Sequence, residues 1–277
     1  MVRQFILLHV SVGKVESEEN NKESVICMFR IICLLIGYVF GMFQTSYIIG
    51  KINGIDIREH GSKNAGFTNT NRVLGMKMGA IVFVLDIMKA VAAFYAATFV
   101  YNRFFVIDFF SFFGMHSYNE PIPYFMYAGG TIFTSSHILP GLYAGIGAIL
   151  GHCFPILLKF KGGKGVACTL GLIFMLDWRI ALISFAIGLV AVAITRFISV
   201  ASLLISLSVP ILLLVFGNPA AVHDFPAPGM TVYFYSSMEG VWVTAALCVF
   251  IWFLHRENIR RLLSGTENKF SFTRRAV

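Results

Sequence analysis

Residues 166–194 read VACTLGLIFMLDWRIALISFAIGLVAVAI, an apolar run that is broken near its middle by Asp177, Trp178 and Arg179. Charged side chains at this point predict a tight turn between two short helices. Each helix would hold roughly 15 residues, fewer than the ~20 that usually cross a bilayer. Counting both as crossings predicts seven transmembrane helices for the chain, and five are the alternative if this hairpin only dips into the membrane.

Further apolar runs occupy residues 29–50, 79–100, 124–158, 199–217 and 239–254. The composition agrees, with 57% hydrophobic residues, 13% charged residues and a mean hydropathy of +0.76. A soluble core of this length does not need so many apolar residues. The sequence therefore predicts the all-α class, as one polytopic membrane bundle of helices. The long run 124–158 is expected to be one bent helix, kinked at Pro140 and rich in glycine.

Lysine and arginine residues predict how the bundle is oriented. Fifteen of them fall in four segments that alternation places on one side of the membrane, namely 51–78, 159–165, 195–198 and 255–277. The opposite loops hold only Arg103 and Arg179. Basic segments favour the cytoplasm, so we expect an outside N-terminus and a cytoplasmic C-terminus. The net charge of +8 is then a topology signal and does not require a nucleic-acid partner.

The cysteines and the N-terminal residues carry little functional signal. The five cysteines lie in or beside apolar runs and form no CxxC pair, which argues against zinc or disulfide roles. Residues 1–27 combine a short apolar stretch with an acidic patch, and the apolar stretch is too short for a signal sequence. We expect an extension over 1–27, a native start at Met28 and a single domain over 28–277. N-terminal sequencing of the native protein tests this expectation.

Two glycine-containing segments on the basic side suit a phosphate. The first, Gly61 to Asn69, reads GSKNAGFTN and is followed by Arg72. Its glycines can turn backbone N–H groups toward one point, while neutral donors and an arginine add hydrogen bonds. The second, FKGGKG over residues 160–165, places Lys164 just before a predicted helix N-terminus, which favours anions. It lacks the spacing of a Walker A loop. Ordinary polar or basic turns are the alternative for both segments.

Two helix boundaries on the same side supply further polar pairs. Ser199 and Ser202 are three residues apart and share a helix face, as do His255 and Asn258. The serines could equally be helix caps, and the basic residues after His255 could be membrane anchors. Because all four segments fall on one predicted side, together they indicate one site for a doubly charged small molecule. Asp86 and Lys89, buried in a predicted span, either brace this site or only bind each other.

The chain resembles the bacterial acyl-phosphate:glycerol-3-phosphate acyltransferases, the PlsY family, over about residues 30–270. The matching stretches are GSKNAGFTNTNRVLG, DIMK, GHCFPILLKFKGGKGVACTLG, TRFISVAS and HRENIRRLLSGTENKF. The resemblance implies a seven-helix enzyme of the bacterial cytoplasmic (inner) membrane whose active site faces the cytoplasm. Such an enzyme transfers an acyl group from acyl phosphate to the 1-hydroxyl of glycerol 3-phosphate, giving lysophosphatidic acid and phosphate. It implies no cofactor, no metal and no obligate protein partner.

The resemblance also implies roles for individual residues. Phosphate groups would be held by a catalytic set made of Ser62, Arg72, Lys164 and Ser202. His255 and Asn258 would bind and orient glycerol 3-phosphate, within a substrate-binding set that also contains Asn64, Asn69, Ser199, Gly162 and Gly163.

The first loop departs from the family pattern at three positions. Lys63, Ala65 and Phe67 stand where the family usually has glycine, proline or another apolar residue, and alanine. Lys63 must either leave the glycine-type backbone geometry or adopt a positive φ, at a cost of about 1 kcal/mol or more.

Two other functions fit parts of the sequence. Acyltransferases that use acyl-CoA or acyl-carrier protein carry an aspartate five residues after a histidine, and none of the seven histidines here has one. A transporter of small organic anions would also have glycine-broken helices and cations at helix ends. However, the charged groups here cluster at one predicted face, and no repeat of two halves is visible.

Overall fold

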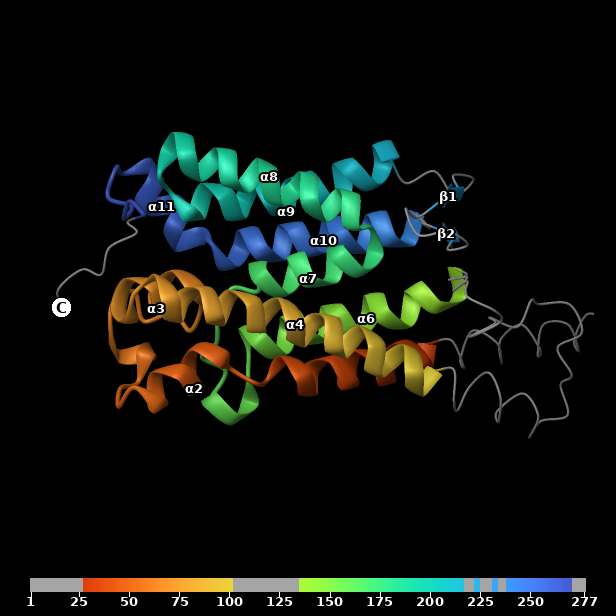
Figure 1. Ribbon diagram of the computed structural model, residues 1–277, viewed down its shortest axis with the longest axis horizontal. Helices are drawn as coiled ribbons and strands as arrows, with labels where there is room; N and C mark the ends of the chain where they lie inside the picture. The colour runs from red at the N-terminus through yellow and green to blue at the C-terminus, as the bar shows by residue number, and fades with distance from the viewer. Residues whose placement is uncertain (1–26, 102–134, 217–221, 225–230, 234–237, 271–277) are drawn as a thin grey trace, which may run out of the picture.

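The computed structural model describes residues 27–101, 135–216, 222–224, 231–233 and 238–270. The predicted extension before Met28, the beginning of the run 124–158, Arg103 and the last two arginines lie outside these residues. The described helices form an elongated bundle and run roughly along its long axis (Figure 1).

A first helix over residues 27–41 opens the described chain. The elements that follow are α2 (Thr45–Ile52), η1 (Ile57–Glu59), α3 (Phe67–Leu74), α4 (Met76–Val100), α6 (Ser135–Cys153), η3 (Ile156–Leu158), α7 (Val166–Leu176), α8 (Trp178–Thr195), α9 (Ile198–Phe216), β1 (Val222–Asp224), β2 (Thr231–Tyr233), α10 (Met238–Leu254) and α11 (Arg256–Leu263).

The prediction of an all-α membrane bundle is confirmed. Among the described residues, five helices are long and apolar enough to cross a membrane, and a sixth crossing is possible if the bent pair α10 and α11 counts as one span. Helix α7 has only 11 residues, about 16 Å of helix against a bilayer core of about 30 Å. Seven crossings therefore stay a prediction, as does the orientation of the termini. The sequence pattern does not predict one small feature. Strands β1 and β2 pair as a two-stranded antiparallel ribbon beyond the helix ends (Figure 1).

The predicted turn between α7 and α8 is confirmed at Asp177. Its carboxylate accepts hydrogen bonds from the backbone N–H groups of Arg179 and Ile180, and so caps the first turn of α8. The same carboxylate pairs with the Arg179 guanidinium at 2.7 Å. Local capping thus ends one helix and begins the next. Helix α7 can be short because protein surrounds it, and its residues Cys168 to Ile173 are all buried.

The glycines of α6 allow helices to approach closely. A Cβ atom at Gly147 would lie 2.0 Å from the carbonyl oxygen of Leu34, and one at Gly37 would lie 1.8 Å from that of Ala144. The first helix and α6 therefore touch backbone to backbone, a contact typical of membrane helices. Pro140 lies inside α6.

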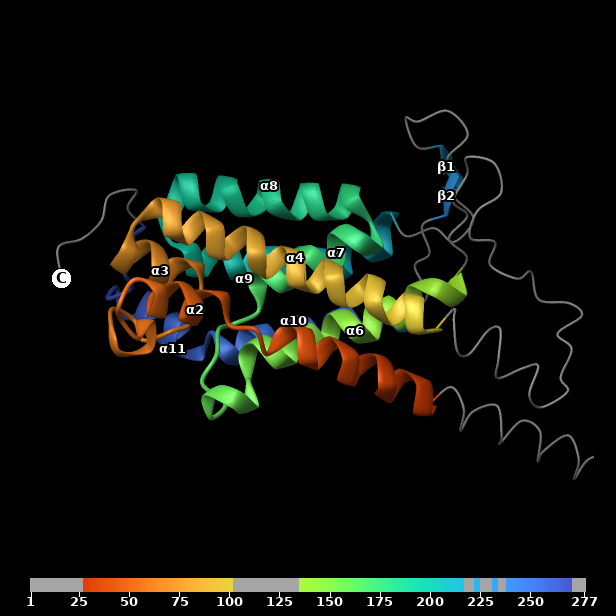
Figure 2. The ribbon, with the colours of Figure 1, turned by 60° about the horizontal axis from the view of Figure 1, so that its bottom comes forward.

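Three of the four predicted segments gather at one end of the bundle. Helix α3, helix α11 and the junction of α8 with α9 lie at this end in both views, whereas β1 and β2 lie at the other (Figures 1 and 2). The backbone N–H of Phe270 donates to the carbonyl of Arg196 at 2.6 Å, which ties the segment after α11 to the α8–α9 junction. The fourth segment, residues 159–165, meets these elements at the cavity described next.

Candidate active site

A cavity of about 1060 Å³ lies where these segments meet. Eight of the eleven predicted site residues line it: Ser62, Asn64, Arg72, Lys164, Ser199, Ser202, His255 and Asn258. Lys63, Arg196, Arg261 and Glu267 are among the other polar residues that line it. Its other part is apolar and includes Phe83, Leu170, Phe185, Leu189, Val192 and Ile205. The tertiary structure thus brings together residues that are almost 200 positions apart in the sequence.

Asn69 builds the first loop and does not line the cavity. Its side chain is fully buried and accepts a hydrogen bond from the backbone N–H of Ser62 at 2.7 Å. Its amide group donates to the carbonyls of Ile57 and His60, each at 3.0 Å. A Cβ atom at Gly61 would lie 2.3 Å from Oδ1 of Asn69, so this close contact needs glycine. Asn69 therefore holds Ser62 in place from behind.

The three unusual residues of the first loop are accommodated. Lys63 adopts a left-handed conformation with φ of 59°, so the loop keeps the glycine-type geometry. Ala65 is buried. Phe67 begins α3, and its ring lies 5.6 Å from that of Phe83 and 6.3 Å from that of Phe270. The substituted loop still presents Ser62, Asn64 and Arg72 to one cavity.

Gly162 and Gly163 also lie behind the cavity wall. A Cβ atom at Gly162 would lie 2.0 Å from the carbonyl oxygen of His152, and one at Gly163 would lie 2.0 Å from Nε2 of the same histidine. Gly165 has a φ of +79° and directs the chain into α7 at Val166. The loop therefore presents Lys164 beside the N-terminus of α7, where unpaired N–H groups favour an anion.

A chain of polar contacts joins Lys164 to the segment after α10. The Lys164 ammonium donates to Oδ1 of Asn258, and Nδ2 of Asn258 donates to Oε1 of Glu267 at 2.9 Å. Nε of Arg261 donates to Oε2 of Glu267 at 2.7 Å, and the Ser199 hydroxyl donates to Oε1 at 3.3 Å. The half-buried Arg261 and the buried carboxylate form an ion pair. Glu267 thus orients a serine, an amide and a guanidinium around one corner of the cavity.

The two titratable residues of this corner have shifted pKa values. The pKa of Lys164 is lowered to about 8, mainly by burial and then by the positive charge of Arg261, against the opposing charge of Glu267. The pKa of His255 is lowered to about 4, mainly by burial and then by Lys164. His255 is therefore neutral near pH 7. Its Nδ1 lies 2.8 Å from the carbonyl of Ile251, so Nδ1 carries the proton and Nε2 keeps a lone pair.

Ser199 and Ser202 lie in the first two turns of α9, and both line the cavity, as their spacing predicted. The Ser202 hydroxyl donates to the carbonyl of Ile198 at 2.9 Å within its own helix. With a small rotation of its side chain, the Ser202 hydroxyl could donate to a phosphate oxygen in the cavity in place of the Ile198 carbonyl.

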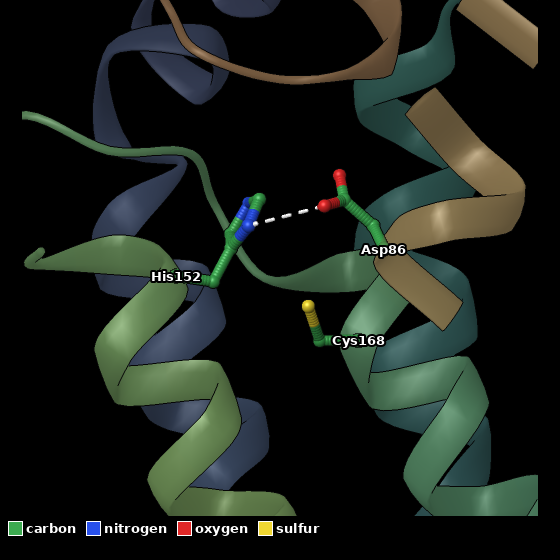
Figure 3. Close-up of side chains that lie close together, drawn as sticks. All are labelled: Asp86, His152 and Cys168. Carbon is green, nitrogen blue, oxygen red and sulfur yellow. Dashed lines mark ion pairs between the residues drawn. The ribbon is translucent and has the colours of Figure 1, made fainter. Parts of the chain in front are cut away.

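One cluster has metal-ligand geometry. The ligand atoms of Asp86, His152 and Cys168 lie within 4.8 Å of one another (Figure 3). However, the Lys89 ammonium lies 2.8 Å from Oδ1 of Asp86 and 2.7 Å from Nδ1 of His152. A cation already uses the atoms that a metal ion would need, so the cluster is better described as a buried ion-pair network. The predicted pairing of Asp86 with Lys89 is confirmed.

The sequence pattern predicts neither Glu267 nor His152 as part of the site. Glu267 stands in a strongly basic segment that also contains Glu257, so the sequence gives no signal that only Glu267 pairs with cations in the site. His152 lies ten residues before the GGK loop in sequence, at the end of an apolar run, and only folding brings its ring against Gly163.

Comparison with known proteins gives a consistent result. A family model described as glycerol-3-phosphate acyltransferase matches residues 31–265. A glycerol-3-phosphate acyltransferase of Chlorobium phaeobacteroides (strain BS1) is 34% identical over 264 residues, covering 88% of this chain and 98% of that protein. One from Mycoplasmopsis agalactiae is 32% identical over 260 residues, covering 88% and 95%.

Two crystal structures of PlsY, an integral membrane glycerol 3-phosphate acyltransferase, are also similar. The glycerol 3-phosphate form has a TM-score of 0.63 and 27% identity, covering 87% of this chain and 96% of the other. The lysophosphatidic acid form has a TM-score of 0.62, also at 27% identity, covering 88% and 96%.

Proposed function

The chain belongs to the glycerol-3-phosphate acyltransferase family of integral membrane enzymes, and we propose that its acyl donor is an acyl phosphate and its acceptor the 1-hydroxyl of glycerol 3-phosphate. The acceptor oxygen would attack the acyl carbon, and the bond from that carbon to the phosphate oxygen would break. The products are lysophosphatidic acid and inorganic phosphate, which places the enzyme in phospholipid biosynthesis.

The observation that carries this proposal is the divided lining of the cavity. One part contains the cations Arg72, Lys164, Arg196 and Arg261, and the other is apolar. An acyl phosphate has the same two parts, an anionic head and a hydrocarbon tail. The solved PlsY forms with glycerol 3-phosphate and with lysophosphatidic acid support an anionic acceptor and a lipid product in the same fold.

The chemistry requires positioning and charge neutralisation more than a strong base. Acyl phosphate is a mixed anhydride with a good leaving group, so the protein mainly has to hold two anions and stabilise the developing oxyanion. The leaving phosphate would accept the proton of the attacking hydroxyl. Neutral His255, with a lone pair on Nε2, would accept a hydrogen bond from glycerol 3-phosphate and orient it, together with Asn258.

The apolar part of the cavity would take the acyl chain. The rings of Phe83 on α4 and Phe185 on α8 stack with centroids 6.2 Å apart. Leu189, one turn further along α8, lines the cavity and is 56% exposed. We infer that the cavity opens toward lipid beside α8, where a hydrocarbon chain needs no water-filled route.

We further infer that the protein lies in the bacterial cytoplasmic membrane with this cavity facing the cytoplasm. The basic residues gathered at the cavity end of the bundle support this orientation. A transporter of small organic anions would need a binding site accessible from both faces. Residues of α3 and α11 line the cavity, and these two helices lie at the end of the bundle away from β1 and β2 (Figures 1 and 2).

Purified protein in detergent tests the proposed reaction. It should release inorganic phosphate from acyl phosphate only when glycerol 3-phosphate is present, and Lys164→Ala or Arg72→Ala should suppress the release. Arg58→Ala is a matched control, because Arg58 pairs with Asp56 on η1 and does not line the cavity. Transport of anions into vesicles without formation of lysophosphatidic acid would refute the proposal.

A further inference from the structure

A buried network of charged side chains lies directly behind the Lys164 loop. Nζ of Lys89 lies 3.0 Å from the carbonyl oxygen of Phe43, 2.7 Å from Nδ1 of His152 and 2.8 Å from Oδ1 of Asp86. The three hydrogens of the ammonium thus have three acceptors. The Thr45 hydroxyl donates to Oδ1 of Asp86 at 2.6 Å. Within this arrangement every charged group has a partner of opposite charge or a hydrogen bond.

The network fixes the state of His152. Because the Lys89 ammonium donates to Nδ1, that nitrogen is the acceptor and the ring proton lies on Nε2. The carbonyl of His152 is also fixed, since it accepts hydrogen bonds from Nε2 of Gln44 at 2.6 Å and from the backbone N–H of Gly163 at 3.0 Å. Both the ring and the backbone of this residue are therefore held.

The Gly162–Lys164 loop packs directly against His152. At Gly162 a side chain would meet the His152 carbonyl, and at Gly163 it would meet Nε2 of the ring, each at 2.0 Å from the added Cβ. The two glycines are needed because the loop lies directly against this residue. The next residue is Lys164, whose ammonium reaches the cavity and binds Asn258. The position of His152 thus constrains the backbone of the loop, and through it the position of the Lys164 ammonium in the cavity.

The cost of such a network indicates a role beyond packing. Asp86 and Lys89 lie inside the membrane span α4 and are 1% and 8% exposed. A buried ion pair is often no more stable than apolar side chains of similar size, and charges within a membrane span are expensive. Asp86 and His152 also line the cavity, so the network lies at its boundary.

We propose that Asp86, Lys89 and His152 are positioning residues that hold the Gly162–Lys164 loop in its phosphate-binding conformation. This inference rests on the proposed function, because it assigns the network to the binding of a phosphate group at Lys164. Lys89 acts through His152, and His152 acts through the backbone of the loop. None of the three needs to touch the reacting atoms.

Paired substitution tests the proposal without leaving a lone buried charge. Asp86→Asn combined with Lys89→Met removes both charges together, and His152→Ala removes the ring but keeps the carbonyl. Each should weaken binding of inorganic phosphate, measured by calorimetry on the purified full-length protein, by a factor on the order of ten or more. The KM for acyl phosphate should rise similarly, with a smaller change in kcat. The thermal midpoint in detergent monitors folding.

A second measurement separates positioning from general destabilisation. If the network acts through Lys164, the paired substitution should add little further loss of phosphate binding in a Lys164→Ala background. A loss of equal size in both backgrounds would overturn the proposal. Unchanged phosphate binding in both the paired variant and His152→Ala would also overturn it.

Cys168→Ala provides the matched control. Its sulfur lies in the same cluster, but among the described residues it does not connect Lys89 to the loop, so phosphate binding should stay at the wild-type level. Zinc that co-purifies with the wild type and is lost in Cys168→Ala, together with weakened phosphate binding, would instead identify a metal site. Phosphate binding needs no turnover. A wild type that binds phosphate but transfers no acyl group would therefore refute the proposed function. Phosphate binding by the variants would still test the positioning role of the network.

Discussion

Glu267 and Asn258 are joined by a hydrogen bond in which Nδ2 of the amide donates to Oε1 of the carboxylate at 2.9 Å. A carboxylate in a cavity for anions would repel them if its charge were not balanced by a cation. Arg261 pairs with the same carboxylate, and Asn258 in turn accepts a hydrogen bond from Lys164. Glu267 therefore directs the Oδ1 atom of Asn258 toward the lysine and holds the guanidinium at the edge of the cavity.

Replacement of Glu267 by alanine should weaken binding of glycerol 3-phosphate. Asn258 and Arg261 would each lose a hydrogen bond to a charged group, which is worth about 1.5–3 kcal/mol, so the KM should rise by roughly tenfold or more. Steady-state kinetics with varied glycerol 3-phosphate measure this effect. Glu59→Ala, which removes an exposed carboxylate at the end of η1, is the control and should behave as the wild type. Equal kinetics for both variants would contradict the assigned role.

The pH dependence should report the ammonium of Lys164. Its pKa of about 8 means that the charge is present below pH 8 and is lost as the pH rises through this value. Phosphate affinity, and with it kcat/KM, should therefore fall above about pH 8. Lys164→Arg keeps its charge at this pH, so whatever activity it retains should lack that fall. A fall of the same shape in both proteins would assign the titration to another group.

His255→Ala separates substrate binding from proton transfer. If the leaving phosphate takes the proton, loss of the imidazole should raise the KM for glycerol 3-phosphate more than it lowers kcat. The low pKa of His255, about 4, agrees with a hydrogen-bonding role, because so weak a base accepts protons poorly. A large fall in kcat with little change in KM would instead identify His255 as the general base.

Asn69→Ala should affect stability as well as activity. The substitution leaves the N–H of Ser62 and the carbonyls of Ile57 and His60 without their partner, and unpaired buried groups cost about 1–3 kcal/mol each. We expect a lower thermal midpoint and weaker phosphate binding. Asn53→Ala is the control, since Asn53 is exposed and its side chain donates to the carbonyl of Ile49 in the preceding helix. Weaker phosphate binding at an unchanged thermal midpoint would indicate direct contact with substrate.

Several features of this protein follow from local sequence alone. Long apolar runs, the break at Asp177 and the glycine-rich loops are properties of neighbouring residues. The solubility of a helix in lipid depends on its own ~20 residues, and the capping of its ends acts within one turn. For Lys63 the sequence leaves two conformations open, and the structure shows that it adopts the positive φ.

Other features depend on how the helices pack. The family resemblance assigns Asn69, Gly162 and Gly163 to substrate binding, yet in the structure these residues support the loops from behind the cavity. Glu267 and His152 belong to the site, although the sequence pattern does not predict them. Residue type and spacing show which groups can bind an anion, but the direction of a side chain depends on contacts with other segments, such as that of Lys164 with Asn258. Only the tertiary structure, which packs α6 against the Lys164 loop and ties the segment after α11 to the start of α9, decides which polar groups face the cavity and which hold its walls.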